Sequence, residues 1–212
     1  MSKEFSVPLP RTTVTSFAPS RTSARTPAWL RSTSIVLAGS ALVAVCAHLA
    51  VPLFFTPVPL SMAPFAVLVL GLLLSPRLAA ATLTAYLIEG AAGLPVFAPT
   101  PAVPGLAHLF GPASFTGGYL LSYPLAASLI AFLFRRASLG NGRAFVRAAL
   151  SATIGSLVIL LCGALWLAVL THASMSSTFM LAVLPFLPGD ALKVAAAAGL
   201  AAGWARLRSR TV

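Results

Sequence analysis

An aspartate and a lysine stand three positions apart in the apolar segment near the end of the chain, within Pro188-Gly189-Asp190-Ala191-Leu192-Lys193. No other charged residue falls between about 181 and 205. Residues three apart share a helix face, so both side chains point the same way. A carboxylate or an ammonium at membrane depth costs several kcal/mol unless it is paired or faces water. The pair therefore either fixes helix packing or holds a polar ligand, and we favour the ligand.

The residues before this pair predict a broken helix. Pro185 and Pro188 disfavour a continuous helix, and Gly189 adds backbone freedom. A fresh helix beginning near Pro188 places Asp190 in its first turn, where the helix dipole favours negative charge. Broken helices at membrane depth are tolerated where they line a cavity, which supports a ligand site. Counted along a helix, Asp190 lies roughly 24 Å from Arg206, in the outer half of the membrane.

Two further residues are candidates for the same site. Glu89 is the other acid among the apolar spans, and it either joins the pocket, pairs with Lys193 or lies at the outer membrane boundary. Tyr119 follows a glycine-rich stretch and offers a ring and a hydroxyl to a small amphipathic ligand, although tyrosine is also common at membrane interfaces. We therefore predict a ligand-binding site formed by Asp190, Lys193, Glu89 and Tyr119.

Several kinds of chemistry have no matching motif. The chain has no phosphate-binding loop ending in Lys-Ser or Lys-Thr, no Gly-x-Ser-x-Gly nucleophile motif and no His-Glu-x-x-His zinc motif. We expect no catalytic residues, no metal site and no resident cofactor. Any energy for uptake must come from an ion gradient or from another subunit.

Composition assigns the chain to the membrane. Charged residues make up only 8% of its 212 residues, against about 25% in ordinary soluble domains. Hydrophobic residues make up 58%, and the mean hydropathy is +0.96. Long apolar runs without alternating strand patterns predict an all-α, multi-pass bundle in the cell (inner) membrane.

The basic residues indicate the orientation. Thirteen of the 14 lie before the first span, in two short connections or after the last span, and the connections between these regions carry no charge. This distribution is the positive-inside pattern, with basic residues near anionic lipid head groups rather than nucleic acid. Six spans, with both termini cytoplasmic, agree with every basic loop. We predict them at about 35–53, 61–75, 78–94, 118–134, 148–171 and 181–205.

These spans define the predicted domains. A flexible basic cytoplasmic tail occupies residues 1–34, since it is rich in Ser, Thr, Pro and Arg and cannot bury apolar surface. The transmembrane substrate-binding domain covers 35–205, and a short basic cytoplasmic tail covers 206–212. A long connection at about 95–116 and a basic loop at 135–147, turning at Gly140-Asn141-Gly142, join the spans.

Five stretches in order carry a family resemblance. They are Pro57-Val58-Pro59-Leu60, Gly71-Leu72-Leu73-Leu74-Ser75-Pro76-Arg77, Tyr86 to Phe97 ending in Gly93-Leu94-Pro95-Val96-Phe97, Gly117-Gly118-Tyr119-Leu120, and Leu184-Pro185-Phe186-Leu187-Pro188-Gly189-Asp190 with Lys193. Over about residues 35–205 the chain resembles the BioY family, the biotin-binding S components of energy-coupling-factor (ECF) transporters.

The resemblance implies a six-helix bundle that captures biotin from outside and delivers it inward. It implies that Asp190 and Lys193 contribute to the biotin site. A carboxylate can accept hydrogen bonds from ureido N–H groups, and an ammonium can hold a carboxylate or a carbonyl oxygen. The resemblance also implies partners, namely a transmembrane coupling protein and ATPase subunits.

Two other functions remain open from the residues alone. A self-sufficient proton-coupled carrier would use Asp190 and Glu89 as proton relays. An intramembrane hydrolase or lipid-modifying enzyme would place polar residues in a cavity, although no nucleophile and base arrangement is visible. Biotin uptake is the function we favour.

Overall fold

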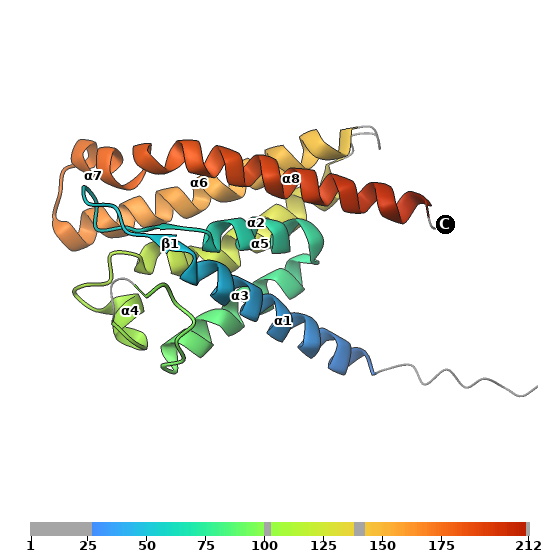
Figure 1. Cartoon of the computed structure of the whole chain (residues 1–212), viewed down its shortest axis with the longest axis horizontal. Coiled ribbons are helices and arrows are strands. Elements are labelled where there is room, and N and C mark those ends of the chain that lie inside the picture. Colours follow the sequence, from blue (N-terminus) through green and yellow to red (C-terminus); the bar gives the residue numbers. More distant parts are fainter. Residues whose placement is uncertain (1–26, 100–102, 138–142, 211–212) are drawn as a thin grey trace, which may run out of the picture.

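Helices make up most of the structure, a computed structural model that describes residues 27–99, 103–137 and 143–210 (Figure 1). A two-stranded antiparallel ribbon, β1 with β2, follows the first helix. In chain order the elements are α1 (Ala28–His48), β1 (Ala50–Val51), β2 (Leu60–Ser61), α2 (Ala63–Leu73), α3 (Pro76–Ala91), α4 (Leu106–Phe110), α5 (Gly117–Arg136), α6 (Ala144–Thr171), α7 (Met175–Ala182), the 3₁₀ helix η2 (Leu184–Phe186) and α8 (Leu187–Arg210).

Each predicted span overlaps a helix. Among the described residues, four helical stretches are long and apolar enough to cross a membrane: Ala28–His48, Gly117–Arg136, Ala144–Thr171 and Ser176–Arg208. The helices at the second and third predicted spans are shorter, with 11 residues in α2 and 16 in α3. At about 1.5 Å per residue, α2 is roughly 17 Å long, which is less than a bilayer core.

The predicted ends of the bundle need correction. Helix α1 begins at Ala28, so residues 28–34 are helical rather than part of a flexible tail. The helix also ends at His48 instead of residue 53, because Ala50 and Val51 pair with Ser61 and Leu60. At the other end α8 continues to Arg210, through most of the predicted tail. Residues 1–26 and 211–212 and the predicted 140–142 turn lie outside the described residues.

Proline and serine set where several helices begin. Pro64 stands in the first turn of α2 and Pro76 in that of α3, where a missing N–H costs nothing. The Ser75 hydroxyl caps α3 by accepting from the Leu78 N–H at 3.4 Å. The predicted break before the last helix is confirmed, because η2 contains Pro185 and α8 starts afresh at Leu187.

Helix α5 is central to the packing, since it contacts α2, α3, α4 and α6. Helix α8 packs against α2 and α6, and α1 packs against α2 and α3. The basic start of α1 and the end of α8 lie toward the same side of the bundle, at the right of Figure 1. The β1–β2 ribbon, α4 and α7 lie toward the opposite side. This arrangement gathers the uncharged connections at one end, beside the amino ends of α2, α5 and α8.

Candidate ligand-binding site

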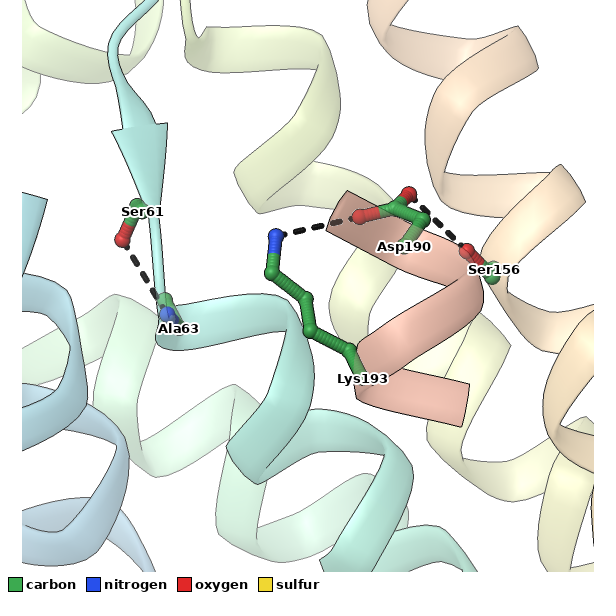
Figure 2. Close-up of polar contacts among 5 residues, drawn as sticks. All are labelled: Ser61, Ala63, Ser156, Asp190 and Lys193. Carbon is green, nitrogen blue, oxygen red and sulfur yellow. Dashed lines mark hydrogen bonds and ion pairs between the residues drawn. The ribbon is translucent and has the colours of Figure 1, made fainter. Parts of the chain in front are cut away.

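Asp190 and Lys193 form an ion pair on one side of α8. The Lys193 ammonium donates to Asp190 Oδ1 at 3.0 Å, and the Ser156 hydroxyl of α6 donates to Asp190 Oδ2 at 3.0 Å (Figure 2). Both residues are buried, each with 7% of its surface exposed. Asp190 stands in the first turn of α8, as predicted, so the helix dipole also stabilises its carboxylate.

A cavity lies beside this pair. About 600 Å³ of space within it is not filled by atoms, part of it open to solvent. The walls are mostly apolar, with Leu120, Ile159 and Phe186 among them. Besides the ion pair, the polar residues that line it are Ser61, Tyr86, His108, Thr116, Tyr119 and Tyr123.

The cavity presents polar groups that still have hydrogen-bonding capacity. An ammonium has three N–H donors, and among the described residues the Lys193 ammonium donates to Asp190. The Tyr86 side chain is fully buried, and its hydroxyl has no hydrogen-bond partner among the described residues. A buried polar group without a partner costs about 1–3 kcal/mol. A polar ligand in the cavity would satisfy such groups.

Tyr119 lines the cavity, but its hydroxyl is already bonded. It donates to the Ala182 carbonyl oxygen at 2.8 Å, which ties the start of α5 to the end of α7. The ring lies over Gly163 of α6, where there is no room for a Cβ atom. Tyr119 therefore contributes a ring face to the cavity wall and a fixed hydrogen bond to the protein.

Glu89 is placed apart from the other three candidates. It lies on α3, and its carboxylate accepts a short hydrogen bond from the Ser40 hydroxyl of α1. The described residues that line the cavity include Tyr86, one turn earlier on α3, but not Glu89. The structure thus brings Asp190, Lys193 and Tyr119 together, and it gives Glu89 a contact between two helices.

Comparison with known proteins assigns the chain to a family. The model of the BioY family matches residues 16–210, which is most of the chain. The chain belongs to the BioY family. Two curated relatives agree with this membership. A Pyrococcus horikoshii protein named "Probable biotin transporter BioY" is 38% identical over 167 residues, covering 79% of this chain and 91% of that protein. A Lactococcus lactis protein named "Biotin transporter BioY2" is 32% identical over 164 residues, covering 77% and 84%.

A solved structure has the same fold as this BioY-family chain. It is the S-component for biotin from an ECF-type ABC transporter, with a TM-score of 0.74 and 22% sequence identity. The match covers 85% of this chain and 92% of the solved one. The shared fold, the family and the four long apolar helices make this chain a multi-pass membrane protein.

Several residues at the cavity or at its ion pair were not predicted from the sequence of this BioY-family chain. Ser156 is one of many serines in apolar helices, and nothing in its neighbourhood indicates Asp190 as its partner. The tyrosines carried a usable signal, because the chain has only three and all of them line the cavity. Tyr86, Tyr119 and Tyr123 come from α3 and α5, and a rare amphipathic residue inside apolar spans points to a polar interior.

His108 is a buried histidine held in one tautomer. Its Nδ1 must donate to the Val103 carbonyl oxygen, at 2.8 Å, because a carbonyl only accepts. Its Nε2 lies 3.3 Å from the Thr116 hydroxyl and so accepts from it in the neutral ring. Burial lowers the pKa of His108, and the hydrogen bond to Val103 raises it by less.

This histidine predicts a loss of stability in acid. The folded pKa lies below the unfolded value of about 6.5, so the unfolded chain binds more protons as the pH falls. Its stabilising contribution is present above about pH 6.5 and declines below it. Thermal unfolding of the purified protein between about pH 7.5 and about pH 5, which spans the usual titration range of histidine, should show this decline. His108→Asn should flatten the pH dependence, whereas exposed His172→Asn should keep it; equal slopes in all three proteins would contradict the assignment.

Proposed function

We propose that this chain is the biotin-binding membrane subunit of a transporter, which captures biotin from outside and delivers it inward. The observation that carries the proposal is the buried Asp190–Lys193 pair in the wall of an otherwise mainly apolar cavity. The family supports the identity of the ligand, since its curated relatives are named biotin transporters. The chain is not an enzyme, because these relatives are transporters by name.

The chemistry of the cavity suits biotin. Biotin combines an apolar thioether ring and chain with a ureido group and a carboxylate. The apolar walls accept the ring and chain, while Asp190 accepts from ureido N–H groups and Lys193 donates to a carbonyl or carboxylate oxygen. The ion pair is also electrically neutral overall, which keeps the empty site stable until a ligand shares its hydrogen bonds. Biotin is the cargo, and no resident cofactor is part of the proposal.

The membrane arrangement follows from the same proposal. Six membrane-crossing segments, with α2 and α3 as short members and α7–α8 as a broken last one, put both termini in the cytoplasm of the cell. The cavity then lies toward the outer side, near the uncharged connections, and the basic residues meet the inner leaflet. The solved structure that shares the fold is an S-component from an ECF-type ABC transporter, so the proposed source of energy is a transmembrane coupling protein with ATPase subunits of such a transporter.

A proton-coupled carrier would need Asp190 and Glu89 to exchange protons across the cavity. Glu89 instead lies against Ser40 and outside the described cavity lining, so no observation favours that alternative. Uptake into vesicles of the isolated chain, without ATPase subunits and abolished by collapsing the pH gradient, would revive it.

A binding titration tests the proposed function directly. Purified protein in detergent should bind biotin tightly with one molecule per chain, and excess riboflavin or thiamine should not displace it. Isothermal calorimetry measures both affinity and stoichiometry. Absence of heat and of thermal stabilisation with biotin, in a protein that is helical and monodisperse, would contradict it.

Tyr86→Phe should affect stability and binding in opposite directions. The variant removes a buried hydroxyl that has no partner in the described structure, so the empty protein should be at least as stable as wild type. If that hydroxyl bonds to biotin, affinity should fall by about three- to tenfold, corresponding to a hydrogen bond of about 0.5–1.5 kcal/mol. Thermal unfolding with and without biotin measures both effects.

Tyr119→Phe provides the contrasting control for this prediction. It removes a hydrogen bond that the empty protein already makes to Ala182, so the empty protein should become less stable. Unchanged biotin affinity in Tyr86→Phe would exclude the Tyr86 hydroxyl from the site.

A further inference from the structure

A second hollow lies at the other end of the bundle, among the ends of four helices. Its walls come from the end of α2, the end of α5, the start of α6 and the last turns of α8. About 890 Å³ within it is not filled by atoms, part of it open to solvent. The α8 residues that line it, Ala201, Trp204, Ala205 and Arg208, recur at helical spacing and form one face.

Three arginines from three different helices line this hollow. They are Arg135 of α5, Arg147 of α6 and Arg208 of α8, and the described lining contains no acidic residue. The whole chain has only three acids, and the two within the helices, Glu89 and Asp190, are bonded elsewhere. Arg147 also stands in the first turn of α6, where the helix dipole adds positive potential. The described walls of the hollow therefore place the charges of Arg135 and Arg147 close together without a carboxylate beside them.

The Arg147 side chain is held by two contacts, but one of its N–H donors has no hydrogen-bond partner among the described residues. Its guanidinium carbon lies 4.7 Å from the centre of the Phe134 ring, and its Nη1 donates to the Ala137 carbonyl oxygen at 3.2 Å. Its Nε is buried and has no hydrogen-bond partner among the described residues. Arginine presents a planar fork of donors that matches carboxylate and phosphate oxygens. A fixed guanidinium with an unused buried donor is a pre-positioned anion contact.

An apolar groove beside the hollow shares Arg147 as a lining residue. Arg147 also lines a neighbouring depression between α5 and α6, together with Leu133, Leu150 and Ile154. Exposed Trp204 borders the hollow itself, and tryptophan is enriched at the head-group level of membranes. Charged residues thus meet an apolar track that runs along membrane-crossing helices.

We propose that this hollow binds the phosphate of an anionic phospholipid, with an acyl chain in the groove between α5 and α6. Basic pockets between membrane helices on the cytoplasmic side are suited to anionic head groups. The groove favours a lipid over soluble phosphate, which would gain nothing from Leu133, Leu150 and Ile154. It also favours a lipid over an acidic segment of a partner protein, because such a segment would not follow the outside of the helices into the bilayer.

Lipid retention by the purified full chain tests this site. Delipidated protein in neutral detergent is titrated with phosphatidylglycerol or with phosphatidylcholine of the same acyl chains, and bound lipid is counted by native mass spectrometry. We expect wild type to retain one phosphatidylglycerol with at least tenfold preference over phosphatidylcholine. Arg147→Gln should reduce that preference about tenfold, and Arg147→Lys should restore only part of it because the fork is lost.

Matched variants and soluble ligands distinguish the outcomes. Arg77→Gln removes an exposed charge that does not line the hollow, and it should leave retention within about twofold of wild type. Exposed Arg135→Gln provides a second test if Arg147→Gln is not helical and monodisperse. Equal losses in Arg77→Gln and Arg147→Gln would overturn the site in favour of general charge attraction. If inorganic phosphate protects the protein against thermal unfolding as strongly as phosphatidylglycerol does, the hollow binds soluble phosphate and the lipid proposal is wrong. A lack of any preference for phosphatidylglycerol would also overturn the proposal.

Discussion

Replacing Asp190 with leucine and Lys193 with methionine in one variant should leave the protein folded and abolish biotin binding. A buried ion pair can often be exchanged for apolar residues of similar size without loss of stability. If the pair existed only to hold helices together, such a variant would fold and still bind the ligand. Because we assign the pair to the ligand, we expect no detectable biotin binding alongside a normal thermal transition.

The single variants complete this test. Asp190→Asn keeps the shape of the side chain but removes its charge, and Lys193→Ala leaves the carboxylate unpaired apart from Ser156. Each should weaken biotin binding at least tenfold, or about 1.4 kcal/mol. Lys193→Ala should also destabilise the protein, since breaking a buried pair costs about 3–5 kcal/mol. Wild-type affinity in the double apolar variant would show that the pair serves only packing.

Gly163→Ala should disrupt the cavity by displacing Tyr119, which lines it. A Cβ at this position would lie 2.2 Å from Cε1 of Tyr119, closer than real contacts allow, so the ring must move. Tyr119 is buried and bonded to Ala182, and moving it strains both the packing and that hydrogen bond. Overpacking of this kind typically costs about 1–3 kcal/mol. We expect a lower unfolding temperature and weaker biotin binding from this single methyl group.

Gly199→Ala is the matched control for that substitution. Gly199 also lies inside a long helix, but nothing in the described structure lies within 4 Å of an added Cβ. Alanine should therefore stabilise α8 by about 0.5–1 kcal/mol and leave biotin affinity unchanged. Comparable losses in both variants would mean that helix glycines matter generally, and not the contact with Tyr119.

The features that could be predicted from the sequence depend on local chemistry. Two prolines and a glycine next to an isolated charge pair were enough to predict the broken last helix and the shared helix face of Asp190 and Lys193. Long apolar runs likewise placed helices at each predicted span. The predicted ends of the spans were less accurate. Helix α1 ends early because Ala50 and Val51 pair with residues 61 and 60, which lie well beyond the helix in the sequence.

Contacts between segments that are distant in the sequence could not be predicted from it. Glu89 looked equivalent to Asp190 as an acid in an apolar run, and only the position of Ser40 on α1 separates their roles. Ser156 and His108 are inconspicuous in the sequence, yet the fold brings each of them to the cavity or to its ion pair. Such assignments require the packing of α1 on α3 and of α6 on α8 to be known.

The distribution of aromatic residues gives the protein a built-in optical reporter. All three tyrosines border the cavity, while the tryptophans at 29, 166 and 204 do not. A guest entering that space would therefore perturb the near-ultraviolet bands of tyrosine and leave those of tryptophan nearly unchanged. Difference absorption spectroscopy on the unlabelled chain could then follow occupancy in real time, with Tyr86→Phe, Tyr119→Phe and Tyr123→Phe apportioning the signal.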